Sequence, residues 1–428
     1  MRSLLFLIFL SLPWVLQAQG SPKKAQVGYP VEDGKFLLNM LRLHPDQFKT
    51  ILDKRKTFEV QIIYTQINRD QSNRPEFKTF LYNVDTGRYF YPASTVKFPM
   101  VLLALEKLNT LQNPLINKYT PIYHDSAYSG QRWARADTTS EGGVPSIAHY
   151  AKKIFVVSDN EAFNRLYEWV GQREANEKLK LNGYNIRLLH RLDRRLTPDE
   201  NRHTEAVRFA SRDTLIYQQP MLTNDSIVVN KKIMKGKAYY EKGVYIRKPF
   251  NLSYRNSFPL PDQQEMLKVI IFPESVPLAK RFNLSDEDRR FVLQYMSQLP
   301  TETIYPAYYQ DSTYSDAYGK FLLYGADTTR IPDHIRIFNK VGNAYGYVID
   351  NAYIVDFEAG VEFMLSAVIY ANKDEIFNDD KYEYKTVALP FMKNLGELIY
   401  DYEKHRVKKT NPDLSEFKLQ YDLKKDDD

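Results

Sequence analysis

The sequence predicts a mixed α/β fold of the α+β type: an antiparallel sheet built from N- and C-terminal strands, helices on both of its faces, and a helical subdomain. Segments rich in aromatic and β-branched residues occur near both ends of the chain, at 58–67 and 77–84 and again at 334–343, 352–358 and 361–372. Apolar residues recur at helical intervals between these two sets, and 43% hydrophobic residues among 428 can supply a sizeable core.

The first 18 residues are interpreted as a secretion signal. Met1 and Arg2 precede an apolar stretch, Leu4–Leu16, that is shorter than the roughly 20 residues needed to cross a bilayer. We therefore expect an exported protein, periplasmic or extracellular, with no membrane span in its mature form. An uncleaved anchor is the alternative, because Leu16 is large for its place before the cleavage site after Ala18.

The segments up to residue 183 begin with a helix. Residues 19–57 are an N-terminal segment in which the apolar spacing from Phe36 to Leu52 predicts a helix interrupted near Pro45. The strands 58–67 and 77–84 follow and indicate an antiparallel pair. Helical patterns at 94–111 and from 147 to about 183 predict the helical subdomain.

The second half of the chain returns to strands. Residues 207–258 are polar, rich in Tyr and punctuated by Gly and Pro, so they are interpreted as an insertion. The three C-terminal strands follow, and an amphipathic helix at about 383–403 closes a main domain predicted to span 58–403. Residues 404–428 are expected to be a charged C-terminal tail.

Composition excludes several classes of function. The 59 basic and 53 acidic residues are interspersed, so the net charge of +6 gives no basic run that would bind nucleic acid. The chain has no cysteine, which excludes a lipoprotein anchor, disulfides and thiolate chemistry. The seven histidines never take a zinc-protease spacing, and no nucleotide-binding glycine motif occurs, so we expect neither a metal nor a cofactor. The oligomeric state stays open.

A serine and a lysine three residues apart open a strongly apolar helix. The spacing occurs three times, at Ser21, Ser94 and Ser415, so the pattern alone is weak. Only Ser94 begins an apolar helix, where Lys97 would lie over the same helical face as the hydroxyl. Amides at a helix N-terminus favour a developing oxyanion. Burial and a second positive charge would lower the pKa of Lys97 enough for it to accept a proton.

The alternative interpretation of this pair is structural, with Ser94 as a helix cap and Lys97 as a solvated side chain. Two tripeptides that each occur once change the balance, and these are Ser158-Asp159-Asn160 and Lys340-Val341-Gly342. Taken singly, Ser158 would cap the next helix and the second tripeptide would end a strand.

In this order and setting, the three motifs resemble those of the penicillin-recognising serine hydrolases, and most closely the class A β-lactamase fold. The resemblance runs from about residue 58 to 400, apart from the insertion, and includes Arg191-Leu192-Asp193-Arg194. It implies an acyl-enzyme on Ser94, with Lys97 as the proton acceptor and a β-lactam or cell-wall peptide as the small-molecule substrate. It also implies that Ser158 relays a proton to the leaving nitrogen and that Lys340 adds positive potential.

The same resemblance assigns the substrate contacts. Asn160 would hold a substrate amide, and Gly342 would let the substrate backbone approach. The backbone amides of Ser94 and Asn343 would form the oxyanion hole, where each donor is worth about a hundred- to a thousandfold in rate.

Two positions depart from the class A pattern. When Pro198 and Asn201 are aligned, Thr197 stands where a glutamate activates the deacylating water, and a threonine hydroxyl is a poor general base. Either Asp199 or Glu200 replaces that glutamate from a shifted loop, or deacylation is slow or occurs by another route. Val341 removes a hydroxyl that would bind a substrate carboxylate, so the natural substrate is expected to lack that carboxylate.

Three activities fit these observations. The leading one is a β-lactamase-like hydrolase that acts on a β-lactam or a related amide. A D,D-peptidase or esterase acting on cell-wall peptides is the enzymatic alternative, motivated by Thr197 and Val341. A binding protein of the same fold, weakly acylating or not catalytic at all, is the third.

Overall fold

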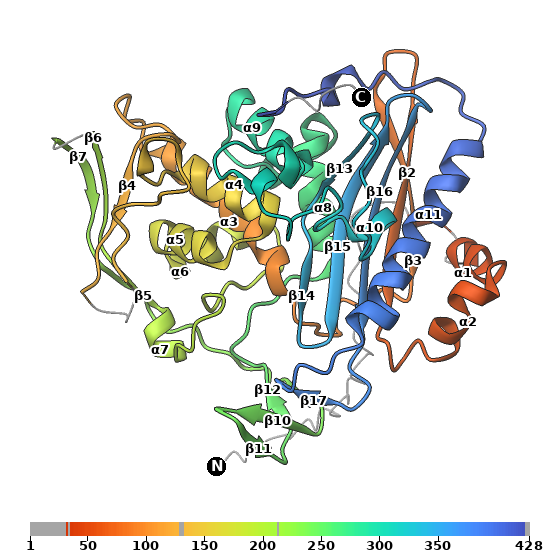
Figure 1. The fold of residues 1–428 in the computed structure, drawn as a ribbon, viewed down its shortest axis with the longest axis horizontal. Helices are drawn as coiled ribbons and strands as arrows, with labels where there is room; N and C mark the ends of the chain where they lie inside the picture. Colours follow the sequence, from red (N-terminus) through yellow and green to blue (C-terminus); the bar gives the residue numbers. More distant parts are fainter. Residues whose placement is uncertain (1–30, 33–34, 128–131, 212–213, 424–428) are drawn as a thin grey trace, which may run out of the picture.

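The computed structural model describes residues 31–32, 35–127, 132–211 and 214–423 (Figure 1). The secretion signal expected at 1–18 lies outside the described residues. None of the described helices has the length and apolar character needed to cross a membrane.

One large sheet forms the centre of the protein, and its strands come from both ends of the chain. Its hydrogen-bonded order is β1-β3-β2-β16-β15-β13, with β14 also paired to β15. Every pairing is antiparallel except that of β1 with β3. This confirms the predicted sheet, and its strands are Val31–Glu32 (β1), Gln61–Arg69 (β2), Pro75–Tyr82 (β3), Ile335–Asn339 (β13), Gly342–Ala344 (β14), Tyr347–Asp356 (β15) and Val361–Tyr370 (β16).

The strand predicted at 334–343 follows one line along β15, although it is divided into β13 and β14. Asn339 pairs with Ala352 and Gly342 pairs with Ile349, which is the same register. Lys340 lies between the two strands, and its backbone N–H donates to the carbonyl of Asn351 at 3.2 Å. The lysine is therefore held at a fixed position on the edge of the sheet.

Helices cover both faces of the sheet, as predicted (Figure 1). One face carries α1 (Lys35–Arg42), α2 (Pro45–Asp53), α10 (Phe321–Tyr324) and α11 (Leu389–His405), which share a core cluster with the strands. A proline has no N–H to give to a preceding turn, so the break between α1 and α2 falls directly before Pro45. On the other face α8 (Leu260–Ile271) contacts β2, β15 and β16.

The helical subdomain lies beside α8, on the left of Figure 1. It consists of α3 (Lys97–Thr110), α4 (Ile147–Val157), α5 (Asn160–Val170), α6 (Gln172–Leu181) and α9 (Asp286–Ser297), with the short α7 (Pro198–Asn201) in the loop after α6. Almost every residue of α3 is buried, because other elements of the core surround it. The serine–lysine helix is thus a central support of the subdomain.

The stretch 207–258, expected to be an insertion, contributes to two separate places. Its first strands, β6 (Val207–Ser211) and β7 (Thr214–Gln219), extend β4 (Ile122–His124) into a sheet on the helical subdomain, and β8 (Leu222–Thr223) pairs with β5 (His203–Thr204). The remaining strands lie at the lower end of Figure 1, and these are β9 (Met234–Lys235), β10 (Ala238–Glu241), β11 (Val244–Ile246) and β12 (Phe250–Asn251), with β17 (Ile376–Phe377) paired to β10.

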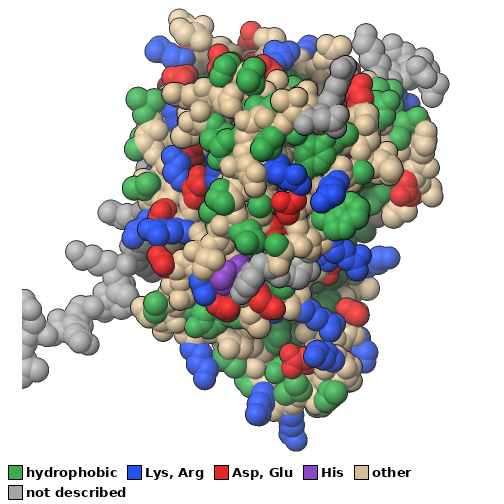
Figure 2. Space-filling model, turned by 90° about the vertical axis from the view of Figure 1, so that its left-hand side faces the viewer, with side chains coloured by type: hydrophobic (Ala, Val, Ile, Leu, Met, Phe, Trp, Pro, Cys, Tyr) green, Lys and Arg blue, Asp and Glu red, His purple; other side chains and the backbone are tan. Residues whose placement is uncertain are grey.

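The segment expected to be a charged tail, 404–428, is described as far as residue 423. It runs back over the face of the sheet that α8 covers, where Leu414 and Phe417 are buried in the core. On the face shown in Figure 2, acidic and basic side chains are interspersed with hydrophobic ones.

Candidate active site

Four of the predicted side chains meet at the junction of α4 and α5. Lys97 Nζ donates to the carbonyl oxygen of Ser158 and, at 2.7 Å, to Asn160 Oδ1, and it lies 3.1 Å from Ser158 Oγ. Lys340 Nζ donates to the same Ser158 Oγ at 2.8 Å and to the carbonyl of Val341 at 3.0 Å. One hydroxyl therefore bridges two lysine nitrogens that come from a helix and from the edge of the sheet.

The backbone at this junction explains why the Ser158 hydroxyl is available to the two lysines rather than used to cap α5. Ser158 ends α4 with a φ of +61°, a left-handed conformation that is uncommon for a residue other than glycine. Asp159 caps α5 instead, accepting from the backbone N–H of Ala162 at 2.7 Å. Ser158 is therefore the C-terminal cap of α4, and its interpretation as the N-terminal cap of the next helix is wrong.

Ser94 lies on a 3-10 turn, Ala93–Val96, that leads directly into α3. It is partly exposed and caps neither helix, while Lys97 is fully buried, so both parts of the structural interpretation are wrong. Within the described ranges, Ser94 Oγ makes no hydrogen bond. The expected bond between Ser94 and Lys97 is not formed, because the Lys97 amine donates instead to the oxygens of Ser158 and Asn160. Lys97, Lys340, Ser158 and Asn160 together form the lysine cluster.

Gly342 joins the turn of Ser94 to the sheet. A Cβ atom at this position would lie 2.8 Å from both the carbonyl oxygen of Pro92 and the backbone nitrogen of Ser94. No side chain fits at that distance, so glycine is what allows β14 to pack directly against the turn. The next residue, Asn343, is exposed on the same strand and pairs with Val348.

Electrostatics at the cluster favour an uncharged amine. Burial, and then the charge of Lys340, hold the pKa of Lys97 well below its usual value. Burial, followed by the charge of Lys320, lowers the pKa of Lys340 to about 7, although the nearby carboxylate of Asp350 acts in the opposite direction. The two lysines therefore share the cluster with fewer than two full charges at neutral pH.

Sequence reasoning did not find the groups behind Lys340. Lys320 is buried and donates to the carbonyls of Met296 and Ile337 and to Asn339 Oδ1, while Asn339 donates to Asp350 at 2.9 Å. Burial lowers the pKa of Lys320 to about 7 and raises that of Asp350 to about 6. No motif surrounds Lys320 in the sequence, so only the fold reveals it.

The loop after α6 is tied down by buried polar contacts. Arg191 and Glu168 form an ion pair at 2.5 Å in which neither side chain is exposed. Asn201 Oδ1 accepts from the backbone N–H of Arg191 at 2.9 Å and closes the loop on itself. These contacts fix the backbone that carries the positions aligned with the deacylation residues.

The two carboxylates expected as replacements for the missing glutamate are both engaged elsewhere. Thr197 caps α7, and Glu200 accepts from its backbone N–H at 2.6 Å and from its hydroxyl at 2.9 Å. These hydrogen bonds lower the pKa of Glu200. Asp199 pairs with Arg202 at 2.7 Å. Neither carboxylate forms a hydrogen bond to the lysine cluster.

Asp193 is the acidic group of this loop that does lie near the cluster. It has a φ of +52° and an exposed side chain, and its charge acts to raise the pKa of Lys97. As for metals, no group of three or more potential ligand side chains occurs in the described part of the chain.

Comparison with known proteins supports the resemblance. Residues 45–241 match the "Beta-lactamase enzyme family", a range that contains Ser94, Lys97, Ser158 and Asn160 and ends before Lys340. The match confirms the predicted likeness to penicillin-recognising serine hydrolases over those residues. No protein with a curated description matches the chain in sequence.

The chain is also similar to solved structures at low sequence identity. A β-lactamase from Xanthomonas campestris is 15% identical, with 85% of this chain and 97% of that chain covered and a TM-score of 0.44. A β-lactamase from Chitinophaga pinensis is 11% identical, with 83% and 98% covered and a TM-score of 0.45. PBP-A is 14% identical, with 85% and 96% covered and a TM-score of 0.44.

Proposed function

We propose that this chain is an exported serine hydrolase that is acylated at Ser94 by a β-lactam or a related amide and releases the acyl group slowly. The observation that carries the proposal is the hydroxyl of Ser158, which lies within hydrogen-bond distance of both Lys97 Nζ and Lys340 Nζ. The match of residues 45–241 to a family of β-lactamases supports it.

In the proposed mechanism, substrate binding turns Ser94 Oγ toward Lys97, as catalytic hydrogen bonds often tighten only in the complex. Uncharged Lys97 takes the hydroxyl proton while the oxygen bonds to the substrate carbonyl carbon. The proton then passes through Ser158 to the leaving nitrogen as the amide bond breaks. Backbone amides of Ser94 and Asn343 hold the oxyanion, and the free Nδ2 of Asn160 contacts a substrate carbonyl.

Slow release follows from the loop that carries Thr197. Glu200 is bound to Thr197 and Asp199 to Arg202, so neither is placed to activate a water at the ester. The same observation favours the second candidate, a peptidase or esterase acting on cell-wall peptides, because such an enzyme transfers its acyl group without a dedicated carboxylate.

Intact-mass spectrometry over a time course tests the proposal. Benzylpenicillin should add its mass to the wild type, and Ser94→Ala should gain nothing. Ser158→Ala should acylate about a hundredfold more slowly or worse, the usual range for a lost proton relay. Fast turnover of a chromogenic cephalosporin that disappears in Ser94→Ala would reject the peptidase candidate. If the wild type forms no adduct with penicillin or with a D-alanyl-D-alanine thioester, the fold serves binding only.

A further inference from the structure

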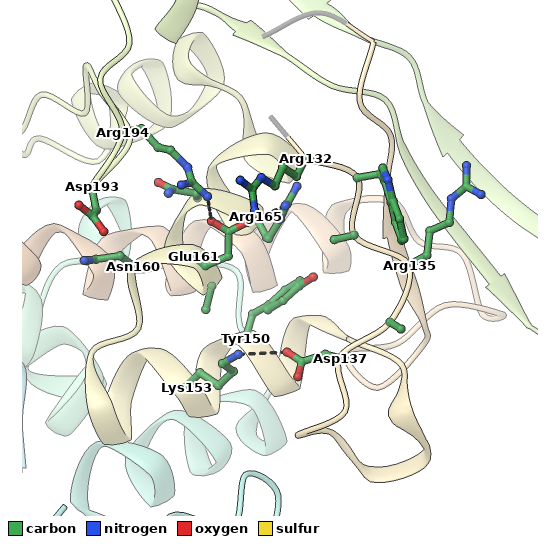
Figure 3. A pocket seen from close by; sticks show the side chains of 15 residues that line it. Arg132, Arg135, Asp137, Tyr150, Lys153, Asn160, Glu161, Arg165, Asp193 and Arg194 are labelled. Carbon is green, nitrogen blue, oxygen red and sulfur yellow. Dashed lines mark hydrogen bonds and ion pairs between the residues drawn. The ribbon is translucent and has the colours of Figure 1, made fainter. Parts of the chain in front are cut away.

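A pocket on the side of α4 and α5 adjoins the cluster of Lys97, Lys340, Ser158 and Asn160 (Figure 3). Its volume is about 420 Å³, within the usual range for sites of small molecules. Asn160 lines it, and the amide oxygen of the same residue accepts from Lys97. Figure 3 shows Asn160 and Asp193 at one side of this pocket and Arg135 at the other. The proposed mechanism assigns it no role.

The charges around this pocket leave hydrogen-bond donors in excess. Five cationic side chains and three carboxylates line it. Glu161 already pairs with both Arg165 and Arg194, and Asp137 pairs with Lys153. The guanidinium of Arg135 lies over the ring of Trp133, and Arg132 has no ion pair or hydrogen bond within the described ranges.

Two buried side chains in the pocket wall have donors without a partner. The side chain of Arg165 is only 4% exposed, and among the described residues its Nε and Nη1 atoms, which lie behind the pocket surface, make no hydrogen bond. Tyr150 is 3% exposed and forms no hydrogen bond among the described residues, and in Figure 3 its hydroxyl lies in the middle of the pocket. Burial raises the pKa of Tyr150, so the hydroxyl stays a donor at neutral pH. Buried donors are almost always satisfied in proteins, so the Tyr150 hydroxyl marks the place of an acceptor in the pocket.

We propose that this pocket binds a carboxylate carried by the acyl part of the substrate, and that Tyr150 and Arg132 recognise it. Arginine matches a carboxylate with two parallel hydrogen bonds. The carboxylates of Glu161 and Asp137 in the wall disfavour a doubly charged phosphate more than a singly charged carboxylate. As a substrate subsite this pocket rests on the proposed function, and it narrows the substrate to an amide with an acidic acyl group.

Equilibrium binding tests the pocket without requiring acylation. Two probes that differ only in the charged end are adipamic acid, a carboxylate, and adipamide, its neutral analogue. In Ser94→Ala, calorimetry should show adipamate binding roughly tenfold tighter or more, the usual worth of a hydrogen bond to a charged group. The ratio of the affinity for adipamate to that for adipamide should fall toward one when Tyr150→Phe or Arg132→Gln is combined with Ser94→Ala. Arg173→Gln, an exposed arginine on α6 outside the pocket, should keep it.

Equal binding of the two probes, or a preference that survives both pocket variants, overturns the proposal whatever the outcome of the acylation assay. Conversely, failure of penicillin to acylate Ser94 rejects the proposed function while the preference for adipamate can still be measured. When acylation does occur, adipoyl- and adipamoyl-6-aminopenicillanic acid should differ in rate in the same direction as the two probes, and Tyr150→Phe should reduce the ratio. Equal rates for the pair would contradict the link between this pocket and the acyl group.

Discussion

Replacing Lys340 by methionine should move the pH dependence of acylation to higher pH. Lys97 Nζ and Lys340 Nζ bond the same Ser158 oxygen, at 3.1 and 2.8 Å, so the two nitrogens are at most about 6 Å apart. At an effective dielectric constant of about 20, two unit charges at that distance repel by about 3 kcal/mol. A charged Lys340 therefore favours the uncharged form of Lys97 and lowers its pKa, in addition to the effect of burial.

The sign follows from which form of Lys97 reacts. Only the uncharged amine accepts the Ser94 proton, so acylation rises with pH as Lys97 is deprotonated. Lys340 has a pKa of about 7 and holds its charge below that value, so its effect on Lys97 is largest on the acid limb of the profile. Without that charge the pKa of Lys97 rises, so the acid limb should shift to higher pH.

The rate of penicillin mass gain, measured by quenched flow from pH 5 to 9, reports this limb. Its position is independent of any loss of amplitude, so a weaker hydrogen bond at Ser158 does not mimic the shift. Lys152→Met is a matched control: the residue lies on α4 but pairs with Asp422 at 3.7 Å, away from the cluster. A limb that stays in place or moves to lower pH in Lys340→Met would refute the argument.

Three other predictions concern the supports of the site. Gly342→Ala should cost about 1–3 kcal/mol of folding free energy in urea titrations and slow acylation, because its Cβ would lie 2.8 Å from Ser94 N. Glu168→Gln should cost about 3–5 kcal/mol, because it leaves the buried charge of Arg191 without a counter-charge, held only by the carbonyls of Glu200 and His203; a loss below 1 kcal/mol would contradict this. Asp199→Asn and Glu200→Gln should each leave the lifetime of the acyl-enzyme unchanged in mass time courses, and a much longer lifetime in either would identify it as the deacylating base.

Sequence reasoning reached the architecture because the patterns that specify it are local. Alternating and helical periodicities identified the strands and the broken first helix, and Pro45 marked its interruption. The three motifs predicted that Lys97, Ser158 and Lys340 lie together, and in the structure both lysines bond the Ser158 hydroxyl. The order of the motifs along the chain allowed this prediction, through their resemblance to the penicillin-recognising serine hydrolases. The match of residues 45–241 to the β-lactamase enzyme family independently confirms the predicted likeness to penicillin-recognising serine hydrolases over those residues.

What the sequence could not supply are contacts between side chains that are distant along the chain. The residues next to Lys320 in the sequence do not predict that its charge lowers the pKa of Lys340. The residues next to Tyr150 do not predict that its side chain lines a pocket. The sequence also could not predict the direction of the Lys97 side chain. Its amine bonds to Ser158 and Asn160 instead of Ser94, and these two residues lie at the junction of α4 and α5, more than 60 residues later in the chain. Tertiary packing decides side-chain direction even where secondary structure is clear.

The hydrogen bonds of Ser158 give a second reason, independent of burial, for an uncharged Lys97. A neutral amine has two N–H groups and one lone pair. If the N–H groups of an uncharged Lys97 donate to the carbonyl of Ser158 and to Asn160 Oδ1, its lone pair is left to accept from the Ser158 hydroxyl, 3.1 Å away. Lys340 then supplies the hydrogen bond that the hydroxyl oxygen accepts.

If Lys97 were charged, Ser158 Oγ would accept from both lysines, and its own proton would have no acceptor among the described residues. With Lys97 uncharged, the hydrogen bonds would run from Lys340 toward Ser158 and from Ser158 toward Lys97 before any substrate arrives. In the proposed mechanism, a proton that Lys97 takes from Ser94 would reverse the second of these bonds, so that Ser158 could give its proton to a leaving nitrogen. Protonation of Lys97 and release of the leaving group would then be coupled through a single hydroxyl.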